Sequence, residues 1–331
     1  PYLGLLVALT TLVAVAVGGS PVAVVAAVPI ALLFLAATFA GAMFARSFKE
    51  LTFVTVTISV FLTAYTFVPA IFANVTPIAL ISPLTVVVRD LQPLQSVSAA
   101  QIAFATVPFV LCAVVLFLLG IGIYREEDLF TQRPVPLKLL DALAVRVARP
   151  RDAAVLAGLS VPFVFVAELL AVAVLFALPV TVSIPVLLVT IAFIEEVAKS
   201  VGLYAGFERG VFERLDGVAA GDGDGTLRVA LAVGLASGTG FFLAEKATAV
   251  VQAVGLTDLF LGRAAFGDVA GLSGLPPLAL AALFFAPLAL HAVTTGLASV
   301  GASRGRTAYA LALTLATLGH AAYNAGVVSL G

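Results

Sequence analysis

Charged residues are scarce in this sequence. They make up 11% of the chain, against about a quarter in a typical soluble domain, while hydrophobic residues make up 62%. This composition excludes an ordinary soluble domain and indicates a protein whose main partner is the lipid bilayer. The net charge of −1 provides no basic surplus for a nucleic acid. The single cysteine, Cys112, excludes an intrachain disulfide and a cysteine-based zinc site.

What the sequence does have is a series of long apolar runs. Runs of about 20 apolar residues can cross a bilayer as a helix. The sequence therefore predicts an all-α, polytopic transmembrane helical bundle of about eight to nine spans, the first of them short. The predicted spans are 2–17, 22–45, 51–72, 99–124, 153–177, 184–206, 229–254, 277–302 and 307–329.

The basic residues support this topology. If every predicted span crosses once, four loops lie on the same side and carry 13 of the 17 Lys and Arg residues, whereas Arg89 and Arg263 lie on the other side and Lys199 and Lys246 lie inside spans. By the positive-inside rule the four loops are cytoplasmic. Their basic residues are Arg46, Lys49, Arg125, Arg133, Lys138, Arg146, Arg149, Arg151, Arg209, Arg214, Arg228, Arg304 and Arg306.

The polar residues inside the predicted spans are unevenly distributed. They gather after a charged loop at 125–152, which suggests two functional units, 1–150 and 151–331. A charged group at mid-bilayer costs about 2.5–3.5 kcal/mol on insertion scales, so such residues are functional candidates by default. The set comprises Glu168, Glu195, Glu196, Lys199, Glu245, His291, His320 and Asn324.

Several of these residues have a similar predicted depth. Counted from the expected cytoplasmic ends, Glu195, His291, His320 and Glu245 lie 11, 11, 13 and 16 residues inside their spans. At 1.5 Å per residue, these positions are about 16–24 Å from the helix ends, near mid-bilayer. Four helices thus bring polar side chains to one level. A structural role in helix–helix hydrogen bonds could explain any one of these residues. It explains less well why all of them lie at one depth.

Water activation is the chemistry that such a set favours. A buried carboxylate can take a proton from water, and two adjacent carboxylates can divide the roles of base and partner. Both histidines can bind a metal or hydrogen-bond a water and an oxyanion. Lys199, four residues after Glu195, is expected to pair with it. Glu168 lies in a different span and is expected to have a packing or supporting role.

Glycines are spaced for close helix packing near these residues. Gly202 and Gly206 form one small-xxx-small pair, and Gly234 and Gly238 form another. The second pair precedes Glu245 on the same predicted helix, so we expect a neighbouring helix to approach closely there.

Taken together, four motifs resemble the PrsW-type intramembrane proteases, relatives of the CAAX prenyl-protease and bacteriocin-processing group. The motifs are Glu195-Glu196-Val197-Ala198-Lys199, Phe241-Phe242-Leu243-Ala244-Glu245, His291, and His320-Ala321-Ala322-Tyr323-Asn324. They occur in the order typical of that family, over about 153–331.

The resemblance implies an endopeptidase that hydrolyses peptide bonds of membrane-associated proteins, in a prokaryotic plasma membrane. Glu195 would activate water with Glu196 as its partner, and Glu245, His291, His320 and Asn324 would position the water and the oxyanion. Two chemistries stay open: a zinc ion held by His291, His320 and Glu245, or a metal-free glutamate mechanism.

Residues 1–150 resemble a different family, the membrane region of ABC-type exporter permeases. The resemblance rests on Ile81-Ser82-Pro83-Leu84-Thr85 and on the segment 123–130. It implies a permease-like region truncated before Pro1. Because the sequence contains no phosphate-binding loop of the Gly-x-x-x-x-Gly-Lys-Ser/Thr kind, any ATPase is expected to be a separate subunit.

Two further functions compete with proteolysis. One is membrane transport, as an ABC exporter permease or an ion-coupled carrier whose buried Glu and His residues relay protons or only support the fold. The other is an inactive scaffold that keeps the protease fold and binds membrane proteins. The location of the charges favours the protease, because a permease function should place its essential residues in 1–150.

Overall fold

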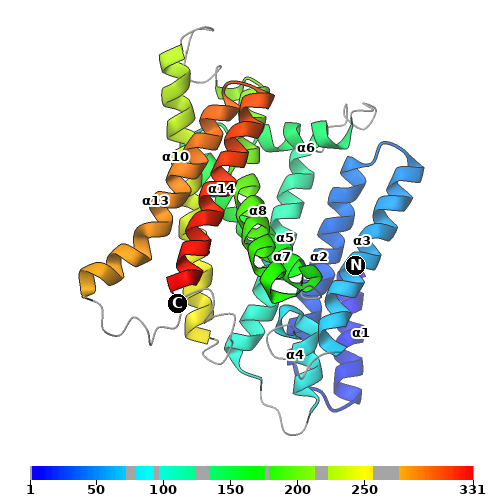
Figure 1. The fold of residues 1–331 in the computed structure, drawn as a ribbon. Helices are drawn as coiled ribbons and strands as arrows, with labels where there is room; N and C mark the ends of the chain where they lie inside the picture. Colours follow the sequence, from blue (N-terminus) through cyan, green and yellow to red (C-terminus); the bar gives the residue numbers. More distant parts are fainter. Residues whose placement is uncertain are drawn as a thin grey trace. The chain divides into compact units, whose positions relative to one another are not determined.

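The computed structural model describes residues 2–71, 79–92, 97–123, 134–175, 179–212, 223–255 and 276–330. Within those ranges all regular secondary structure is helical, which confirms the all-α prediction (Figure 1). The chain divides into two compact units. Unit 1 comprises Pro1–Lys138 and Thr248–Phe266, and unit 2 comprises Leu139–Ala247 and Gly267–Gly331.

Unit 1 is organised around α2 (Val22–Phe44), which packs against α1 (Tyr2–Ala16), α3 (Phe48–Ile71), α4 (Pro83–Asp90) and α5 (Ala99–Ile123). Small side chains allow these contacts, because Ala26, Ala36 and Ala40 of α2 are buried. Large apolar side chains such as Phe53 of α3 remain exposed, as expected of a surface that faces lipid.

A short helical segment between the spans of unit 1 was not predicted. It consists of a 3₁₀ turn, η1 (Ala79–Ile81), followed by α4. Ser82 caps α4 by accepting a hydrogen bond from the Leu84 amide (3.1 Å), and its hydroxyl donates to the Thr66 carbonyl of α3 (2.6 Å). The Ser-Pro pair quoted for the permease resemblance is therefore a helix cap. Of the second quoted segment, only Ile123 lies within the described residues.

Unit 2 contains the five helices α7 (Pro150–Leu175), α8 (Val180–Glu208), α10 (Gly223–Gly255, whose last turns belong to unit 1), α13 (Pro277–Ala302) and α14 (Arg306–Leu330). The amphipathic helix α6 (Val135–Ala144) crosses the boundary between the units. α13 and α14 form a hairpin through a turn at Gly305, whose φ of +101° suits glycine. α8 packs against α7, α13 and α14.

Among the described residues, eight helices are long and apolar enough to cross a membrane: Val22–Phe44, Phe48–Ile71, Ala99–Ile121, Pro150–Val172, Thr181–Glu208, Asp224–Thr248, Phe284–Ala302 and Arg306–Ser329. This number agrees with the prediction of about eight to nine spans, and the described apolar part of α1, Val7–Ala16, is shorter than these eight. The protein is therefore a multi-pass membrane protein. Of the basic residues used for the topology, Arg125, Arg133, Arg214 and Arg263 lie outside the described residues.

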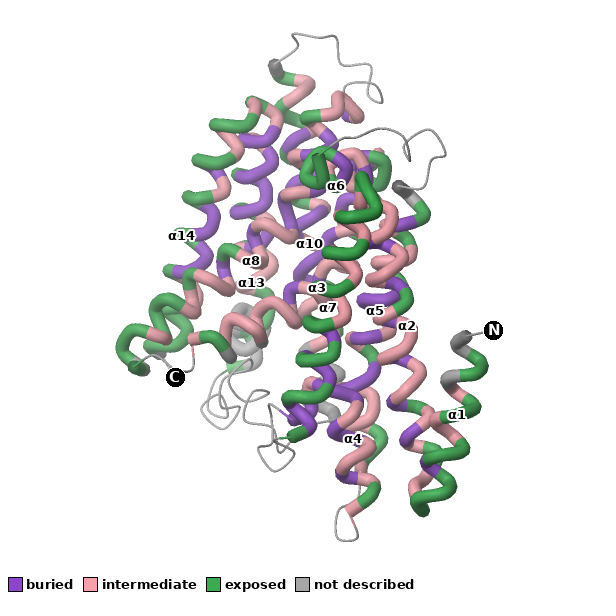
Figure 2. Tube along the Cα trace, turned by 90° about the vertical axis from the view of Figure 1, so that its right-hand side faces the viewer, coloured by how far each residue is buried: buried purple, intermediate pink, exposed green. Residues whose placement is uncertain are grey.

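The spans of unit 2 are apolar outside and polar inside. On α14 the side chains of Leu311, Leu315 and Leu318 are more than half exposed, while His320 is buried. Buried and exposed residues alternate along this helix (Figure 2). An exposed leucine face with a buried histidine suits a helix with lipid on one side and a polar interior on the other.

Four predicted helix starts were three or more residues too late. The helices predicted from 51, 153, 184 and 229 begin at Phe48, Pro150, Val180 and Gly223. The early residues of α10 were excluded from the prediction because Gly and Asp weaken the apolar pattern. Asp224 nevertheless suits a first helical turn, where a negative charge interacts favourably with the positive end of the helix dipole.

Candidate functional site

Close helix crossings position the site. A Cβ atom added to Gly238 of α10 would lie 2.4 Å from the His291 carbonyl oxygen of α13, and one added to Gly234 would lie 2.9 Å from the Gly296 Cα atom. The expected close approach beside Gly234 and Gly238 is thus confirmed, with α13 as the neighbour. It places His291 beside the helix that carries Glu245.

The other predicted glycine pair packs differently. A Cβ atom on Gly202 of α8 would meet the Leu156 side chain of α7 at 2.6 Å, and one on Gly206 would meet the Phe212 ring at 2.4 Å. These glycines therefore accommodate side chains rather than the backbone of another helix.

Four helices of unit 2 bring polar side chains to one place. α8 provides Glu195, Glu196 and Lys199, α10 provides Glu245, α13 provides His291, and α14 provides His320. The rings of His291 and His320 lie 5.2 Å apart at an interplanar angle of 76°. The common depth predicted from the sequence therefore corresponds to direct contact in the fold.

Glu196 is the most enclosed member of this cluster. One carboxylate oxygen, Oε1, accepts hydrogen bonds from Lys199 Nζ (2.6 Å), His320 Nδ1 (2.8 Å) and Thr294 Oγ1 (2.9 Å). The side chains of Glu196 and Lys199 are both 0% exposed. A buried ion pair needs this many partners, because removing two charges from water costs several kcal/mol per ion.

Lys199 pairs with both glutamates of its helix. The expected ion pair with Glu195, four residues earlier, is present at 4.0 Å from Oε2, and a closer one that was not predicted joins the ammonium to Glu196 Oε1, three residues earlier, at 2.6 Å. Both spacings place side chains on one helix face. Both glutamates reach the interior, and Glu196 is the more deeply buried, since its side chain is 0% exposed and that of Glu195 is 13% exposed.

His291 uses both of its ring nitrogens. Its Nδ1 lies 2.8 Å from Lys199 Nζ, and its Nε2 lies 2.9 Å from Glu245 Oε2. An ammonium can only donate and a carboxylate can only accept. His291 therefore accepts from Lys199 at Nδ1 and donates its Nε2 proton to Glu245, which assigns the tautomer.

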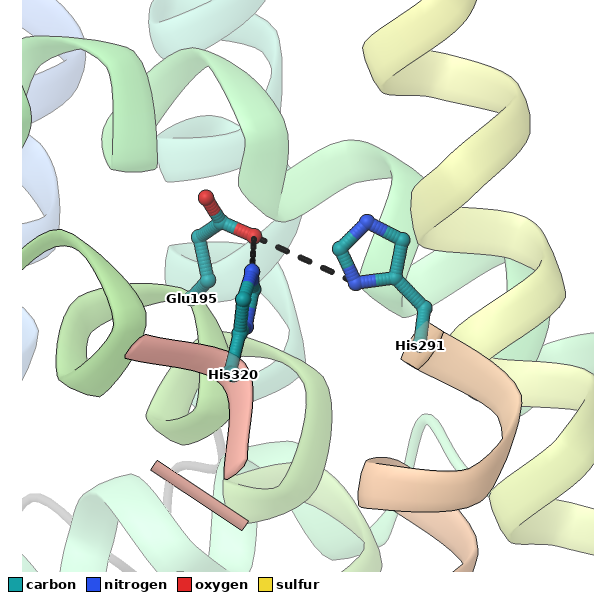
Figure 3. A group of neighbouring side chains, drawn as sticks. All are labelled: Glu195, His291 and His320. Carbon is teal, nitrogen blue, oxygen red and sulfur yellow. Dashed lines mark ion pairs between the residues drawn. The ribbon is translucent and has the colours of Figure 1, made fainter. Parts of the chain in front are cut away.

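His320 has one engaged and one open nitrogen. Nδ1 donates to Glu196 Oε1, while Nε2 lies 3.7 Å from Glu195 Oε2 (Figure 3). A carboxylate on Nδ1 fixes the ring orientation and leaves Nε2 free to exchange a proton. His320 is buried, so this nitrogen faces the interior of the cluster.

Glu195 faces both histidines without a direct hydrogen bond. Its Oε2 is buried, has no hydrogen-bond partner among the described residues, and lies 3.7 Å from His320 Nε2 and 4.0 Å from His291 Nδ1. Polar atoms at such separations are commonly bridged by a water. The ligand atoms of Glu195, His291 and His320 all lie within 4.8 Å of one another, so this group could hold a metal ion.

The predicted metal ligands differ from this group by one residue. The sequence analysis combined His291 and His320 with Glu245, whereas the geometric group contains Glu195 instead. Glu245 binds His291 at Nε2, whereas Lys199 binds the same ring at Nδ1. A carboxylate in that place orients a histidine rather than sharing its ligand position.

The remaining predicted residues lie around this centre. Asn324 is half-buried on α14, and among the described residues no hydrogen bond joins it to the cluster. Glu168 of α7 lies close enough to Glu195 and Glu245 to interact with both carboxylates. Glu168 is thus nearer to the centre than its predicted packing role implied.

Sequence reasoning missed the hydroxyl groups of the site. Thr294 donates to Glu196 Oε1, Ser200 lies 2.9 Å from the Tyr309 hydroxyl, and the Ser237 hydroxyl donates to the Lys199 carbonyl (2.6 Å). Ser and Thr are common inside membrane helices, where they usually bond to the backbone of their own helix, so their identity gave no signal. The position of Thr294, three residues after His291, was the available clue.

Comparisons of the chain with protein-family models, with curated proteins and with solved structures gave no match.

Proposed function

We propose that the protein is an intramembrane endopeptidase in which Glu195 activates a water molecule. The observation that carries the proposal is the environment of Glu195 Oε2, a buried carboxylate oxygen with no hydrogen-bond partner among the described residues, facing two histidine nitrogens at 3.7 and 4.0 Å. A general base needs a free oxygen beside the place where water can bind. Glu196 also has a buried oxygen, Oε2, without a partner among the described residues, but its carboxylate is held by the donors that converge on Oε1, including Lys199 and His320. We assign the base role to Glu195 because its unpaired oxygen is the one that faces both histidine nitrogens.

His320 completes the proton-transfer pathway. With Nδ1 bound to Glu196 and Nε2 directed at Glu195, it can accept the proton taken from water and return it to the leaving amine. Glu196 then stabilises the imidazolium through the 2.8 Å hydrogen bond. This arrangement gives the adjacent glutamates different roles, with Glu195 as base and Glu196 as orienting partner.

The oxyanion of the tetrahedral intermediate needs donors near the same place. Asn324 lies one helical turn after His320 and offers an amide N–H, and the Lys199 ammonium provides positive charge 4.0 Å from Glu195 Oε2. Glu245 keeps His291 oriented through its Nε2 proton. Each motif that resembles the PrsW-type proteases thus contributes at least one residue with an assigned role.

Zinc is the metal that suits a carboxylate and two histidines. When bound, a zinc ion would be held by Glu195, His291 and His320 and would polarise the water or the scissile carbonyl. We assign the substrate to membrane-associated proteins or peptides and the location to a prokaryotic plasma membrane, in accordance with the motif resemblance. A permease-like unit 1 with a separate ATPase subunit belongs to the same proposal.

The decisive experiment compares cleavage products of membrane fractions by mass spectrometry. Cells expressing wild type should yield peptides that disappear with Glu195→Gln, since loss of a general base typically lowers the rate by about 10²–10⁴-fold. Glu50→Gln is the control, because it removes a carboxylate of unit 1 that pairs with Arg46 and takes no part in the cluster. Normal cleavage by Glu195→Gln at wild-type expression would overturn the proposal.

One observation favours proton-coupled transport as a second candidate. A continuous hydrogen-bonded series runs from Glu245 through His291, Lys199 and Glu196 to His320, over four helices. Such series of Glu and His residues carry protons in transporters. Purified protein in liposomes with a pH-sensitive dye tests this candidate: proton flux that is lost in Glu196→Gln, with no cleavage products in any membrane fraction, would support transport over proteolysis.

A further inference from the structure

The two histidines share a pattern that is typical of metal ligands. Each binds a carboxylate through one ring nitrogen, His291 through Nε2 to Glu245 (2.9 Å) and His320 through Nδ1 to Glu196 (2.8 Å). Each directs its other nitrogen toward Glu195 Oε2. Metal-ligating histidines almost always donate their second N–H to such a partner. The ring orientations therefore suit a cation between Glu195, His291 and His320.

The ammonium of Lys199 already lies beside one of the two histidine nitrogens that a metal ion would need. Lys199 Nζ is 2.8 Å from His291 Nδ1, the nitrogen that faces Glu195. A neutral imidazole has one nitrogen lone pair, and here it accepts the ammonium proton. A zinc ion would need the same lone pair at about 2.0–2.1 Å. One nitrogen cannot bind both partners.

The surroundings hold the ammonium in that position. Lys199 Nζ also donates to Glu196 Oε1 at 2.6 Å and lies 5.1 Å from the centre of the Phe241 ring. With its side chain 0% exposed, it is enclosed within the bundle. A buried ammonium with an anion, an imidazole and an aromatic face around it has no better-solvated alternative nearby.

We propose that the Lys199 ammonium is the resident cation of this site, and that it competes with a divalent metal ion for His291 Nδ1. Metal binds with high affinity only when the ammonium leaves this nitrogen. The inference concerns what occupies the site and does not depend on peptide-bond hydrolysis. It predicts that removing the positive charge of Lys199 creates a metal site from the existing residues Glu195, His291 and His320.

The experiment measures cobalt binding to purified, chelator-treated protein in detergent, by visible absorption and by equilibrium dialysis. Lys199→Leu should bind one Co²⁺ per chain about 10–100-fold more tightly than wild type, the range typical of changing a group in contact with a ligating histidine. Lys246→Leu is the matched control, because it removes an ammonium that lies beside Glu245 (3.9 Å) and over the Phe242 ring rather than beside His291. It should leave the affinity unchanged.

Two further variants keep the result interpretable. Because Lys199→Leu leaves Glu196 without its counterion, Lys199→Leu with Glu196→Gln removes both charges and should also bind cobalt more tightly than wild type. Adding His291→Ala to Lys199→Leu should abolish the gain. Equal, tight binding of one Co²⁺ by wild type and Lys199→Leu would overturn the proposal, as would a gain that survives His291→Ala or no gain in either folded variant.

Metal binding and cleavage are separate readouts. A failure of the competition proposal appears as unchanged cobalt affinity, whatever the cleavage assay shows. A failure of the proposed protease function appears as normal peptide products from Glu195→Gln, whatever metal is bound.

Discussion

Both units are built from apolar helices, yet they use their polar side chains in different ways. In the spans of unit 1, several hydroxyl groups bond to the backbone of the same helix, as Thr55 does to the Leu51 carbonyl (2.7 Å) and Thr106 to the Ile102 carbonyl (2.7 Å). In unit 2, Glu196 Oε1 collects side-chain donors from α8, α13 and α14. The first pattern is local, whereas the second requires several helices to be in place.

This difference shows where folding and function are coupled. A threonine that bonds to its own helix keeps its partner wherever the helix packs. A buried carboxylate whose donors come from other helices is satisfied only in one arrangement of the bundle, and a half-satisfied network is costly in a low-dielectric interior. Changes at the cluster of unit 2 should therefore affect stability more than matched changes in unit 1.

The largest expected effect comes from breaking the buried ion pair. Glu196→Leu leaves the Lys199 ammonium enclosed without its nearest anion and should lower the free energy of unfolding by about 3–5 kcal/mol. The measurement is denaturant unfolding of the purified protein in detergent micelles.

Unit 1 provides the matched ion pair for this test. Arg46, just before α3, and Glu50 in its first turn form an ion pair four residues apart, but their side chains are 36% and 34% exposed. Water and salt screen such a pair, so Glu50→Gln should have a much smaller effect. Equal losses for Glu196→Leu and Glu50→Gln would contradict the contrast between the two units.

The sequence was informative where a pattern depends on one helix at a time. Apolar runs predicted the spans, and the depth of Glu195, His291, His320 and Glu245 predicted that they would meet. The spacing of Gly234 and Gly238 predicted a close crossing. Each of these inferences uses only helix geometry and the cost of placing polar groups in lipid.

The sequence was less informative where the outcome depends on which way a side chain turns. Lys199 can reach either glutamate of its helix, and only the packing of α13 and α14 against α8 makes Glu196 its closer partner. The same packing makes Glu245 the partner of His291 and leaves Glu195 in the group with both histidines. Helix spacing alone cannot distinguish these alternatives.

A smaller effect should separate hydrogen bonds to a carboxylate from those to a backbone carbonyl. Thr294→Val replaces by a methyl group a hydroxyl whose single proton is shared between Glu196 Oε1 (2.9 Å) and the Leu290 carbonyl oxygen (3.0 Å). Since a hydrogen bond to a charged group contributes about 1.5–3 kcal/mol, unfolding in detergent should become easier by up to that amount.

The counterpart in unit 1 is Ser82, whose hydroxyl donates to the Thr66 carbonyl at 2.6 Å. A neutral hydrogen bond contributes about 0.5–1.5 kcal/mol, so Ser82→Ala should cost less than Thr294→Val. The reverse order would mean that Glu196 is adequately satisfied by Lys199 and His320 alone.

A further expected loss tests the helix crossing beneath the cluster. Gly238→Ala would place a Cβ atom 2.4 Å from the His291 carbonyl oxygen, and the contact is with backbone, which cannot rotate away. α10 and α13 must separate, at a cost of about 1–3 kcal/mol that outweighs the roughly 0.5–1 kcal/mol by which alanine favours a helix. Because His291 moves with α13, its bonds to Lys199 and Glu245 should lengthen, and cleavage should fall along with stability.

Gly296→Ala is the control on α13, since its added Cβ atom has nothing within 4 Å, so helix propensity alone should leave that variant at least as stable as wild type. If Gly238→Ala proves as stable and active as Gly296→Ala, the position of His291 does not depend on this crossing, and the coupling inferred for unit 2 must come from the hydrogen bonds alone.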